Sequence, residues 1–419
     1  MLNKTKNIIL KVDHFLFKKF GSNKTLKVLE NMKEANIIFS YLNEIGKESK
    51  VRFVGGCVRK ALNGQSIDDI DLATSLKPEE VKQRLKKEGI KVIDTGLMHG
   101  TVTAILGKKK FEITTLRTDL LSDGRHAEVE FTLNWENDAL RRDFTINAIY
   151  ADIEGRIFDP LNGANDLKKG IVKFIGDPTK RIEEDYLRIL RYFRFFLQYS
   201  EKDHDRNTIK SIKKNINGIN KISNERVFSE LKKILSLKNF FKIFRNKDSK
   251  DIILNIFPQF KYIERIKNIE NLDQVILDSF DVCLILALLT IDKSDNYEYF
   301  CHKYKTSNII KGRLKNISEN INTFSKENIK KLIYFSSRDD VKDLLFFSLC
   351  INKKINELNI KELTNYISTC KIPKFPISGD YLKKNGYETG EKLGKKLKLL
   401  EKKWIENNFI INEKEIENL

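Results

Sequence analysis

Two aspartates separated by one residue carry the clearest chemical signal in the sequence. Asp69 and Asp71 lie in the run DDIDL, which has the apolar character of a β-strand. Alternate residues of a strand project to the same face, so the two carboxylates are expected to point together. They repel each other unless a cation lies between them, and Mg²⁺ accepts one or two carboxylates while substrate phosphates complete its octahedron. The pair therefore predicts a site where two magnesium ions activate a 3′ hydroxyl and stabilise a leaving pyrophosphate.

A glycine turn lies just upstream of the aspartates. Gly55 and Gly56 follow a β-like run and precede a helix-like one, so backbone N–H groups there can face a phosphate. Arg59 adds a fixed pair of donors. A Gly-Gly pair by itself is more often a tight structural turn. The complete spacing, GG-x2-R-x9-D-x-D, is specific enough to predict a centre that binds phosphate and metal.

Glu112 is a candidate third carboxylate. It lies in FEITTL, which is a second predicted strand. Two interpretations stay open: a third acidic group beside the metal pair, or a charge on an edge strand.

The segment at 181–195, RIEEDYLRILRYFRF, has residues that can distinguish bases. On one helix, Asp185, Arg188 and Arg191 share a face because they are three residues apart. Cytosine and adenine both present an exocyclic amine beside a ring-nitrogen acceptor. An acceptor-only Asp185 and a donor-only Arg188 therefore match these two bases and oppose uracil and guanine. The alternative is an ordinary surface ion pair between residues i and i+3.

Length and charge bound the class of protein. A chain of 419 residues predicts several domains. The 77 Lys and Arg against 58 Asp and Glu give a net charge of +19, which favours nucleic acid as a partner, although an Ile-, Asn- and Lys-rich composition can also reflect nucleotide bias. No apolar run of about 18 residues is present, so no membrane contact is expected. Five cysteines without CxxC spacing favour a reducing compartment, and the cytoplasm is expected with organellar import left open.

The elements that must position these residues are of two kinds. An amphipathic helix is expected over 28–45, and short β-rich runs follow from 51 to 176, with a helix over 78–88 and a hairpin turn at Gly107. The remainder is helix-like almost throughout. The expected fold class is α+β, with a mixed sheet and helices followed by an all-α region.

These residues resemble the tRNA nucleotidyltransferase and poly(A) polymerase family, bacterial type, within the DNA polymerase beta-like nucleotidyltransferase superfamily. The first family motif, GGxVRDxLLG followed by DxD, is matched over 55–71, except that Lys60 stands where the family has Asp. The second motif matches RRDFTINA at 141–148. In the family it contacts ribose and phosphates, which suits Arg142 as a phosphate donor and Asp143 as the acceptor of a ribose hydroxyl.

Three further segments carry the resemblance. The EDxxR motif at 184–188 assigns base reading to Asp185 and Arg188, with downstream Arg191 and Arg194 contacting the nucleotide. DGRHAEV at 123–129 resembles the flexible loop that family members need for switching from C to A addition. ERVFSE at 225–230 resembles the ERxxxE motif, for which a supporting ion-pair network is expected.

The resemblance implies a division into five parts. They are an N-terminal extension and helix (1–50), a nucleotidyltransferase head with the catalytic carboxylates Asp69, Asp71 and Glu112 (51–176), a helical neck that recognises the base (177–236), and a helical body (237–370) and helical tail (371–419) that bind tRNA.

The activity implied is template-independent addition of C, C and A to the tRNA 3′ end, with CTP, ATP and Mg²⁺ and with no protein partner required. Poly(A) polymerase or a partial CC- or A-adding enzyme is the alternative within the class. A non-catalytic RNA-binding protein is the alternative from another class.

Overall fold

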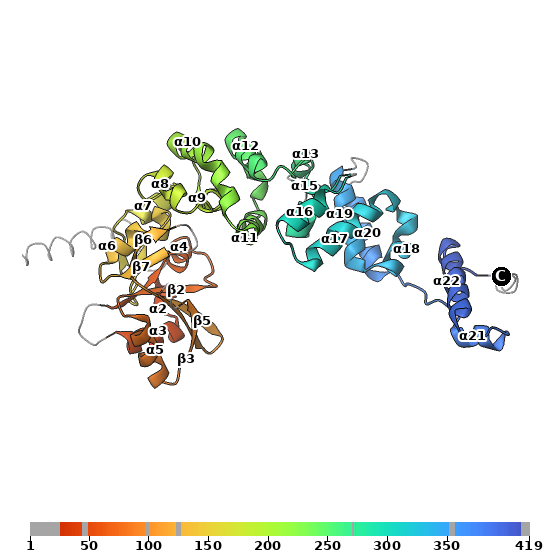
Figure 1. Ribbon diagram of the computed structural model, residues 1–419, viewed down its shortest axis with the longest axis horizontal. Coiled ribbons are helices and arrows are strands. Elements are labelled where there is room, and N and C mark those ends of the chain that lie inside the picture. Colours follow the sequence, from red (N-terminus) through yellow and green to blue (C-terminus); the bar gives the residue numbers. More distant parts are fainter. Residues whose placement is uncertain are drawn as a thin grey trace, which may run out of the picture. The chain divides into compact units, whose positions relative to one another are not determined.

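The chain forms two compact units, Met1–Ile256 and Phe257–Leu419. The computed structural model describes residues 26–43, 49–96, 100–122, 127–269, 272, 274–292, 294–351 and 357–411. The expected α+β class is confirmed, because a mixed sheet in the first unit is followed by helices alone (Figure 1).

The first unit is built on a seven-stranded sheet with the order β3-β4-β5-β2-β1-β8-β9. β2 and β5 pair in parallel, and every other neighbouring pair is antiparallel. The expected hairpin turn at Gly107 is confirmed between β4 and β5. The strands are β1 (Val51–Val54), β2 (Ile70–Thr74), β3 (Lys91–Gly96), β4 (Thr101–Leu106), β5 (Lys109–Thr115), β8 (Tyr150–Ala151) and β9 (Ile157–Phe158).

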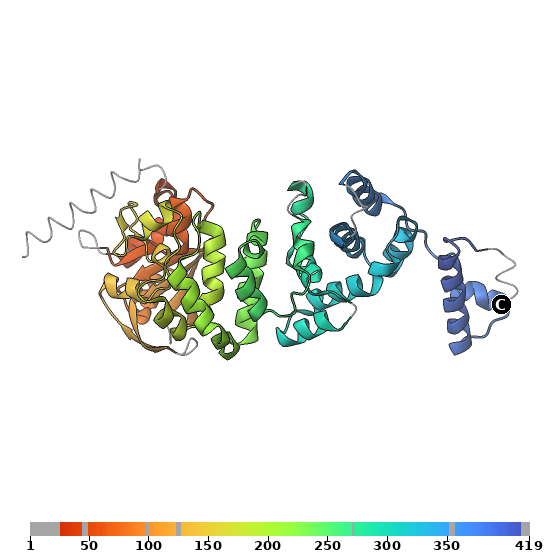
Figure 2. The same cartoon turned by 90° about the horizontal axis from the view of Figure 1, so that it is seen from above.

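Figure 2 shows the sheet and the helices around it from above. The larger apolar core of the unit lies between one face of the sheet and its covering helices, and a smaller apolar cluster that includes Val54 and Ala73 lies on the opposite face. Ile70 and Leu72 of β2 point into the helix-covered core, together with Phe53 of β1. Strand alternation therefore turns Asp71 to the opposite face. The covering helices are α2 (Lys27–Glu30), α3 (Lys33–Leu42), α4 (Gly56–Leu62) and α5 (Pro78–Lys87), and the helix expected over 28–45 is thus two helices.

A smaller layer follows along the chain. The strands β6 (Arg117–Ser122) and β7 (Ala127–Phe131) form a separate two-stranded sheet, and Asp123–His126 of the expected flexible loop lie outside the described residues. The helices α6 (Trp135–Leu140) and α7 (Gly163–Lys168) flank a 3₁₀ turn at Thr145–Asn147. A Cβ at Gly163 would lie 2.0 Å from the carbonyl oxygen of Thr145, so only glycine allows α7 to approach this turn.

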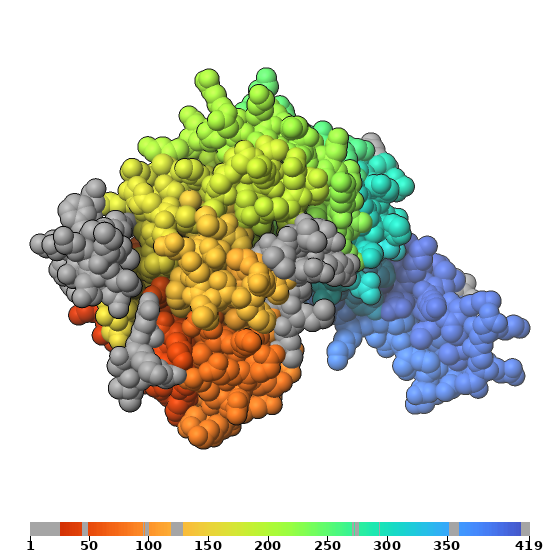
Figure 3. All heavy atoms as spheres, turned by 60° about the vertical axis from the view of Figure 1, so that its left-hand side comes forward, coloured from red at the N-terminus to blue at the C-terminus, as the bar shows by residue number. Residues whose placement is uncertain are grey.

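The neck helices pack directly on the strand-rich part, and the space-filling view passes without a gap from the orange and yellow residues to the yellow-green ones (Figure 3). The neck and the rest of the first unit comprise α8 (Pro178–Glu184), α9 (Arg188–Tyr199), α10 (Arg206–Asn215), α11 (Asn224–Leu235) and α12 (Lys247–Ile256).

The prediction of one continuous recognition helix over 181–195 is wrong. α8 ends before Asp185, whose backbone is extended (φ −153°, ψ 104°), and α9 begins at Arg188. Two contacts favour the break. The Asp185 side chain accepts the N–H of Leu187, which competes with helical hydrogen bonding, and the Tyr186 ring packs directly on Gly218.

The second unit is entirely helical in its described residues. No helix among the described residues is long and apolar enough to cross a membrane. The helices of the second unit are α13 (Ile263–Lys267), α14 (Gln274–Leu277), α15 (Val282–Thr290), α16 (Asn296–Lys303), α17 (Asn308–Asn320), α18 (Ile329–Phe335), α19 (Arg338–Ile351), α20 (Glu357–Thr369), α21 (Gly379–Lys384) and α22 (Glu391–Glu406).

Candidate active site

Two carboxylates lie side by side on the sheet face opposite the larger helix-covered core, and a third directly precedes β2. Asp71 of β2 is the register partner of Glu112 of the parallel neighbour β5, so the two side chains project to the same side. Asp69 lies two residues before Asp71 and within electrostatic reach of it. Asp69 and Glu112 are exposed, and Asp71 is half-buried. The structure therefore places Glu112 beside the predicted metal pair, in a position open to a substrate.

The glycine turn lies between these carboxylates and Arg142. Gly55 has φ +65°, which favours glycine, and its N–H donates to the carbonyl of Ile149. A Cβ at Gly56 would lie 3.7 Å from Asp71 Oδ2, and a Cβ at Gly55 would lie 3.7 Å from Arg142 Nη1. The turn is thus the point where backbone, carboxylate and guanidinium approach one another closely.

The surroundings of Asp71 change the pKa of its carboxyl group. Burial, and then repulsion from Glu112, raises the pKa of Asp71 above its usual range, and attraction from Arg142 offsets part of this rise. A carboxylate that is costly to ionise alone is stabilised by a nearby cation. This electrostatic arrangement is the one expected of a metal ligand.

Arg142 is held by a group that sequence reasoning missed. Asp138 is 1% exposed, and its Oδ2 accepts bonds from Arg142 Nη2 (3.0 Å) and from the hydroxyl of Tyr150 (2.7 Å). Burial alone would raise the pKa of Asp138, but Arg142 and Arg141 lower it well below its usual range. The spacing of Asp138 four residues before Arg142 was the available sequence signal, since i and i+4 are neighbours on a helix.

Arg59 packs against the neck, and its predicted phosphate contact stays a prediction. The residue is 6% exposed, and its guanidinium lies 4.8 Å from the ring centre of Phe195 and 4.9 Å from that of Tyr199, both on α9. It also donates to the side-chain oxygen of Asn147. Arg59 therefore joins the glycine turn to the neck, and a phosphate contact would require its displacement from these rings.

Asp143 and Arg191 form a buried ion pair between head and neck. Arg191 Nε donates to Asp143 Oδ2 at 2.7 Å, and Asp143 Oδ1 accepts the side-chain amide of Asn147 at 2.8 Å. Burial alone would raise the pKa of Asp143, but Arg191 lowers it well below its usual range. Asp143 is 7% exposed, so its ribose contact stays a prediction.

The side chains of the base-reading candidates already form ion pairs with other residues of the neck. Asp185 Oδ2 accepts from Arg226 Nη2 at 2.8 Å, and Arg188 pairs with Glu184. Arg194 pairs with Glu230, which is 2% exposed. The ion-pair network expected for the segment at 225–230 is thus present. It connects α11 to Asp185, between α8 and α9, and to Arg194 of α9.

The carboxylates suit a hard divalent cation that shares its coordination with a substrate. Among the described residues, no three His, Cys, Asp or Glu side chains form a complete metal-binding group. A cation held by Asp69 and Asp71 would take its other ligands from phosphates and water, which Mg²⁺ accepts.

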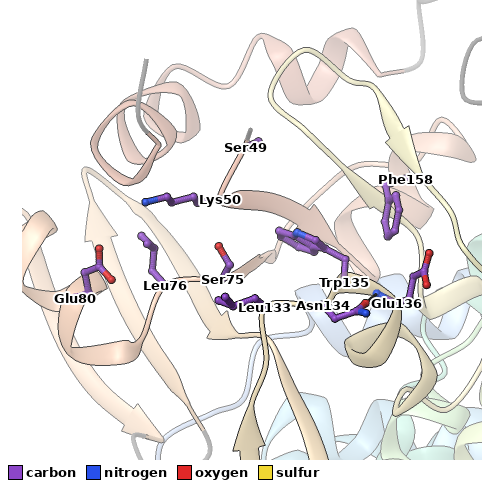
Figure 4. Close-up of a pocket in the computed structure, with 10 residues that line it drawn as sticks. All are labelled: Ser49, Lys50, Ser75, Leu76, Glu80, Leu133, Asn134, Trp135, Glu136 and Phe158. Carbon is purple, nitrogen blue, oxygen red and sulfur yellow. Dashed lines mark hydrogen bonds between the residues drawn. The ribbon is translucent and has the colours of Figure 1, made fainter. Parts of the chain in front are cut away.

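A separate pocket of about 820 Å³ lies at the other end of β2, lined by side chains that include Ser75, Trp135 and Phe158 (Figure 4). Ser75 follows Asp71 by four residues, or about 13 Å of strand. This pocket is therefore distinct from the carboxylate site.

Family models match two parts of the chain. The model described as the poly A polymerase head domain matches residues 51–173, and the model described as the probable RNA and SrmB-binding site of polymerase A matches residues 205–263.

Curated relatives match most of the chain. The human protein CCA tRNA nucleotidyltransferase 1, mitochondrial, is 34% identical over 389 residues, which cover 89% of this chain and 86% of the relative. The CCA-adding enzyme of Lactobacillus helveticus is 36% identical over 279 residues, which cover 63% of this chain and 66% of that protein.

Solved structures share the fold. The Bacillus stearothermophilus CCA-adding enzyme in complex with CTP has a TM-score of 0.68 at 24% identity and covers 91% of this chain and 94% of its own. The Thermotoga maritima CCA-adding enzyme in complex with tRNA has a TM-score of 0.63 at 21% identity, with coverages of 94% and 97%.

The raised pKa of Asp71 predicts that this residue lowers the stability of the metal-free protein. The penalty is absent below the unfolded-state pKa, grows between the two pKa values and is fully present above the folded-state pKa, because ionising Asp71 costs more free energy in the folded protein than in the unfolded chain. Asp71→Asn should therefore raise Tm at pH 7 in EDTA, and this gain should disappear as the pH falls toward the unfolded-state pKa. Asp68→Asn, at an exposed aspartate paired with Lys60, is the control and should give no gain. A Tm for Asp71→Asn at or below that of the wild type at pH 7 would contradict the assignment.

Proposed function

Because this chain belongs to the CCA tRNA nucleotidyltransferase family, we propose that it adds C, C and A in turn to the 3′ end of tRNA, from CTP and ATP, with release of pyrophosphate. The observation that carries the residue assignments is the pairing of Asp71 with Glu112 across two parallel strands, on an open face beside Gly56 and Arg142. The non-catalytic alternative leaves this costly set of like charges unexplained.

Asp69 and Asp71 are the residues that would hold the metal, and we assign Mg²⁺ because the donors are carboxylate oxygens. When bound, two such ions supply activation of the attacking 3′ hydroxyl and stabilisation of the leaving pyrophosphate. Glu112 either completes this acidic group or sets its electrostatic field, since its charge raises the pKa of Asp71.

The triphosphate lies in this proposal beside the glycine turn. The absence of side chains at Gly55 and Gly56 allows close approach, and Arg142 supplies positive charge at that point. The bonds of Arg142 to Asp138 and Tyr150 fix its guanidinium in advance, so little conformational entropy is lost when phosphate binds. Asp143 is assigned to the ribose side of the same site, where it also orients Arg191.

Base selection is assigned to Asp185 and Arg188, with Arg191 and Arg194 supporting them. An incoming cytosine or adenine would share or replace the bonds that Asp185 makes to Arg226 and that Arg188 makes to Glu184. Uracil and guanine would set a carbonyl acceptor or a ring N–H donor against a like group of the partly buried Asp185 and Arg188, a loss on the order of a few kcal/mol.

The remaining assignments concern partners and location. The basic helical region from 237 to 419 is assigned to the tRNA backbone, because neutralising phosphates needs little sequence reading. No protein partner is required by the proposed reaction. Cytoplasmic and organellar locations are both compatible with this chain, and three of its relatives are named as mitochondrial enzymes.

The activity is tested by a product ladder. Purified protein and tRNA lacking its CCA end should yield two added residues with CTP alone and three with CTP and ATP together, as read on a sequencing gel. Extension with ATP alone into a long ladder would identify a poly(A) polymerase instead, and arrest after two residues with both nucleotides would identify a partial enzyme.

Asp71→Ala should lower nucleotide incorporation on the order of 10³-fold or more, because the cation loses a ligand at the reacting centre. Binding of tRNA, measured by filter retention, should stay close to that of the wild type. Asp68→Ala is the matched control and should remain active. EDTA should lower incorporation by the wild type to a similar extent. Added Mg²⁺ should restore incorporation by the wild type but not by Asp71→Ala. Unchanged incorporation by Asp71→Ala would refute the metal assignment.

Arg188→Ala should loosen the choice of nucleotide rather than simply slow addition. Loss of the donor should reduce discrimination against UTP by about 10- to 100-fold in kcat/KM, the range expected for one charged hydrogen bond. Arg206→Ala, at an exposed position of α10, is the control. Full discrimination retained by Arg188→Ala would count against base reading by this residue.

A further inference from the structure

Arg181 lies at the junction of the two halves of the proposed site, and nothing in its sequence position marked it. It belongs to α8, and its side chain is 11% exposed. We propose that Arg181 is a positioning residue that couples base selection by the neck to triphosphate binding by the head. The inference rests on the proposed roles of Arg188 and Arg142.

On the head side, Arg181 binds the backbone that carries Arg142. Its Nη2 donates to the carbonyl oxygens of both Arg141 and Arg142. Arg141 is the C-cap of α6, where carbonyl groups lack partners within the helix and carry partial negative charge. Arg181 therefore satisfies and immobilises the end of the helix whose Asp138 holds the Arg142 guanidinium.

On the neck side, Arg181 and Arg188 share one carboxylate. Both guanidinium groups pair with Oε2 of Glu184, and Arg188 Nη1 also donates to the carbonyl of Arg181 at 2.7 Å. The position of Arg188 therefore depends on the position of Arg181 through two separate contacts. If Arg188 shifts when it binds a base, Arg181 would shift with it and would move the backbone of Arg141 and Arg142 in the head.

The chemistry of arginine suits this bridging position. One guanidinium presents donors in a rigid plane, so a single side chain can hold two carbonyls and a carboxylate, which the point charge of lysine cannot do. Burial, and then the neighbouring Arg188, lowers the pKa of Arg181. Its Nε, moreover, has no hydrogen-bond partner within the part of the chain that the structure describes. Desolvation and the neighbouring cation therefore offset part of the stability that these three contacts contribute.

The test uses full-length protein, tRNA lacking its CCA end and separate kinetics with CTP and UTP. Arg181→Met should reduce discrimination against UTP by about tenfold and lower kcat for CTP more than it raises KM, because the groups remain present but lose their alignment. Arg181→Lys, which keeps the charge without the fork, should give an intermediate discrimination. In an Arg188→Ala background, Arg181→Met should cause no further loss of discrimination, since both substitutions interrupt the same contact.

Two control variants separate this coupling from loss of stability. Tyr192→Phe removes the neck hydrogen bond to His204 Nδ1 (3.0 Å), and Arg156→Met removes an exposed head ion pair. Both should retain wild-type discrimination, whatever their Tm. If Arg181→Met unfolds, Arg181→Lys decides the question.

The outcomes are distinguishable. Wild-type discrimination by Arg181→Met or Arg181→Lys, with Arg188→Ala impaired, would overturn the coupling and leave the proposed function intact. Additive losses in the double variant would also overturn it. Wild-type discrimination by Arg188→Ala itself would overturn base reading, and the coupling with it.

Discussion

Repulsion among carboxylates on one sheet face is the constraint on which the site depends. Parallel pairing of β2 and β5 sets Glu112 beside Asp71, and Asp69, just before β2, adds a third negative charge within electrostatic reach of Asp71. Burial, and then repulsion from Glu112, raises the pKa of Asp71, and both effects favour a cation that binds beside these carboxylates. The sheet can hold them because its opposite face packs against four helices in a continuous apolar core. The stability of the core therefore offsets the unfavourable electrostatics of the open face.

A second feature is a set of three ion pairs with buried acidic partners, one within the head, one between head and neck, and one within the neck. Arg142 is paired with Asp138, Arg191 with Asp143, and Arg194 with Glu230, and each of these three acidic partners is at least nine-tenths buried. Buried ion pairs contribute little net stability once desolvation is included, so their value here is geometric. They fix the positions of three guanidinium groups in advance, and that of Arg142 lies within electrostatic reach of Asp71.

Several features were accessible to sequence reasoning because they depend on local order. The hairpin at Gly107 followed from turn chemistry, and the helix at 78–88 followed from its proline and glycine ends. Others depend on contacts between distant segments. Arg59 packs against Phe195 and Tyr199, more than 130 residues away, and the break after α8 depends in part on the packing of Tyr186 against Gly218.

The sequence by itself determined the fold class, the family and the residue types available for metal and nucleotide, because periodicity and motif spacing are properties of the chain read in order. Only the tertiary structure decided which strand lies beside β2, and so turned Glu112 from an ambiguous charge into a neighbour of Asp71. It also revealed Asp138 and Arg181, whose partners become visible only when the chain folds back on itself. The physical reason is that hydrogen bonds between side chains, and from side chains to distant carbonyls, depend on angstrom-scale positions that no linear pattern encodes.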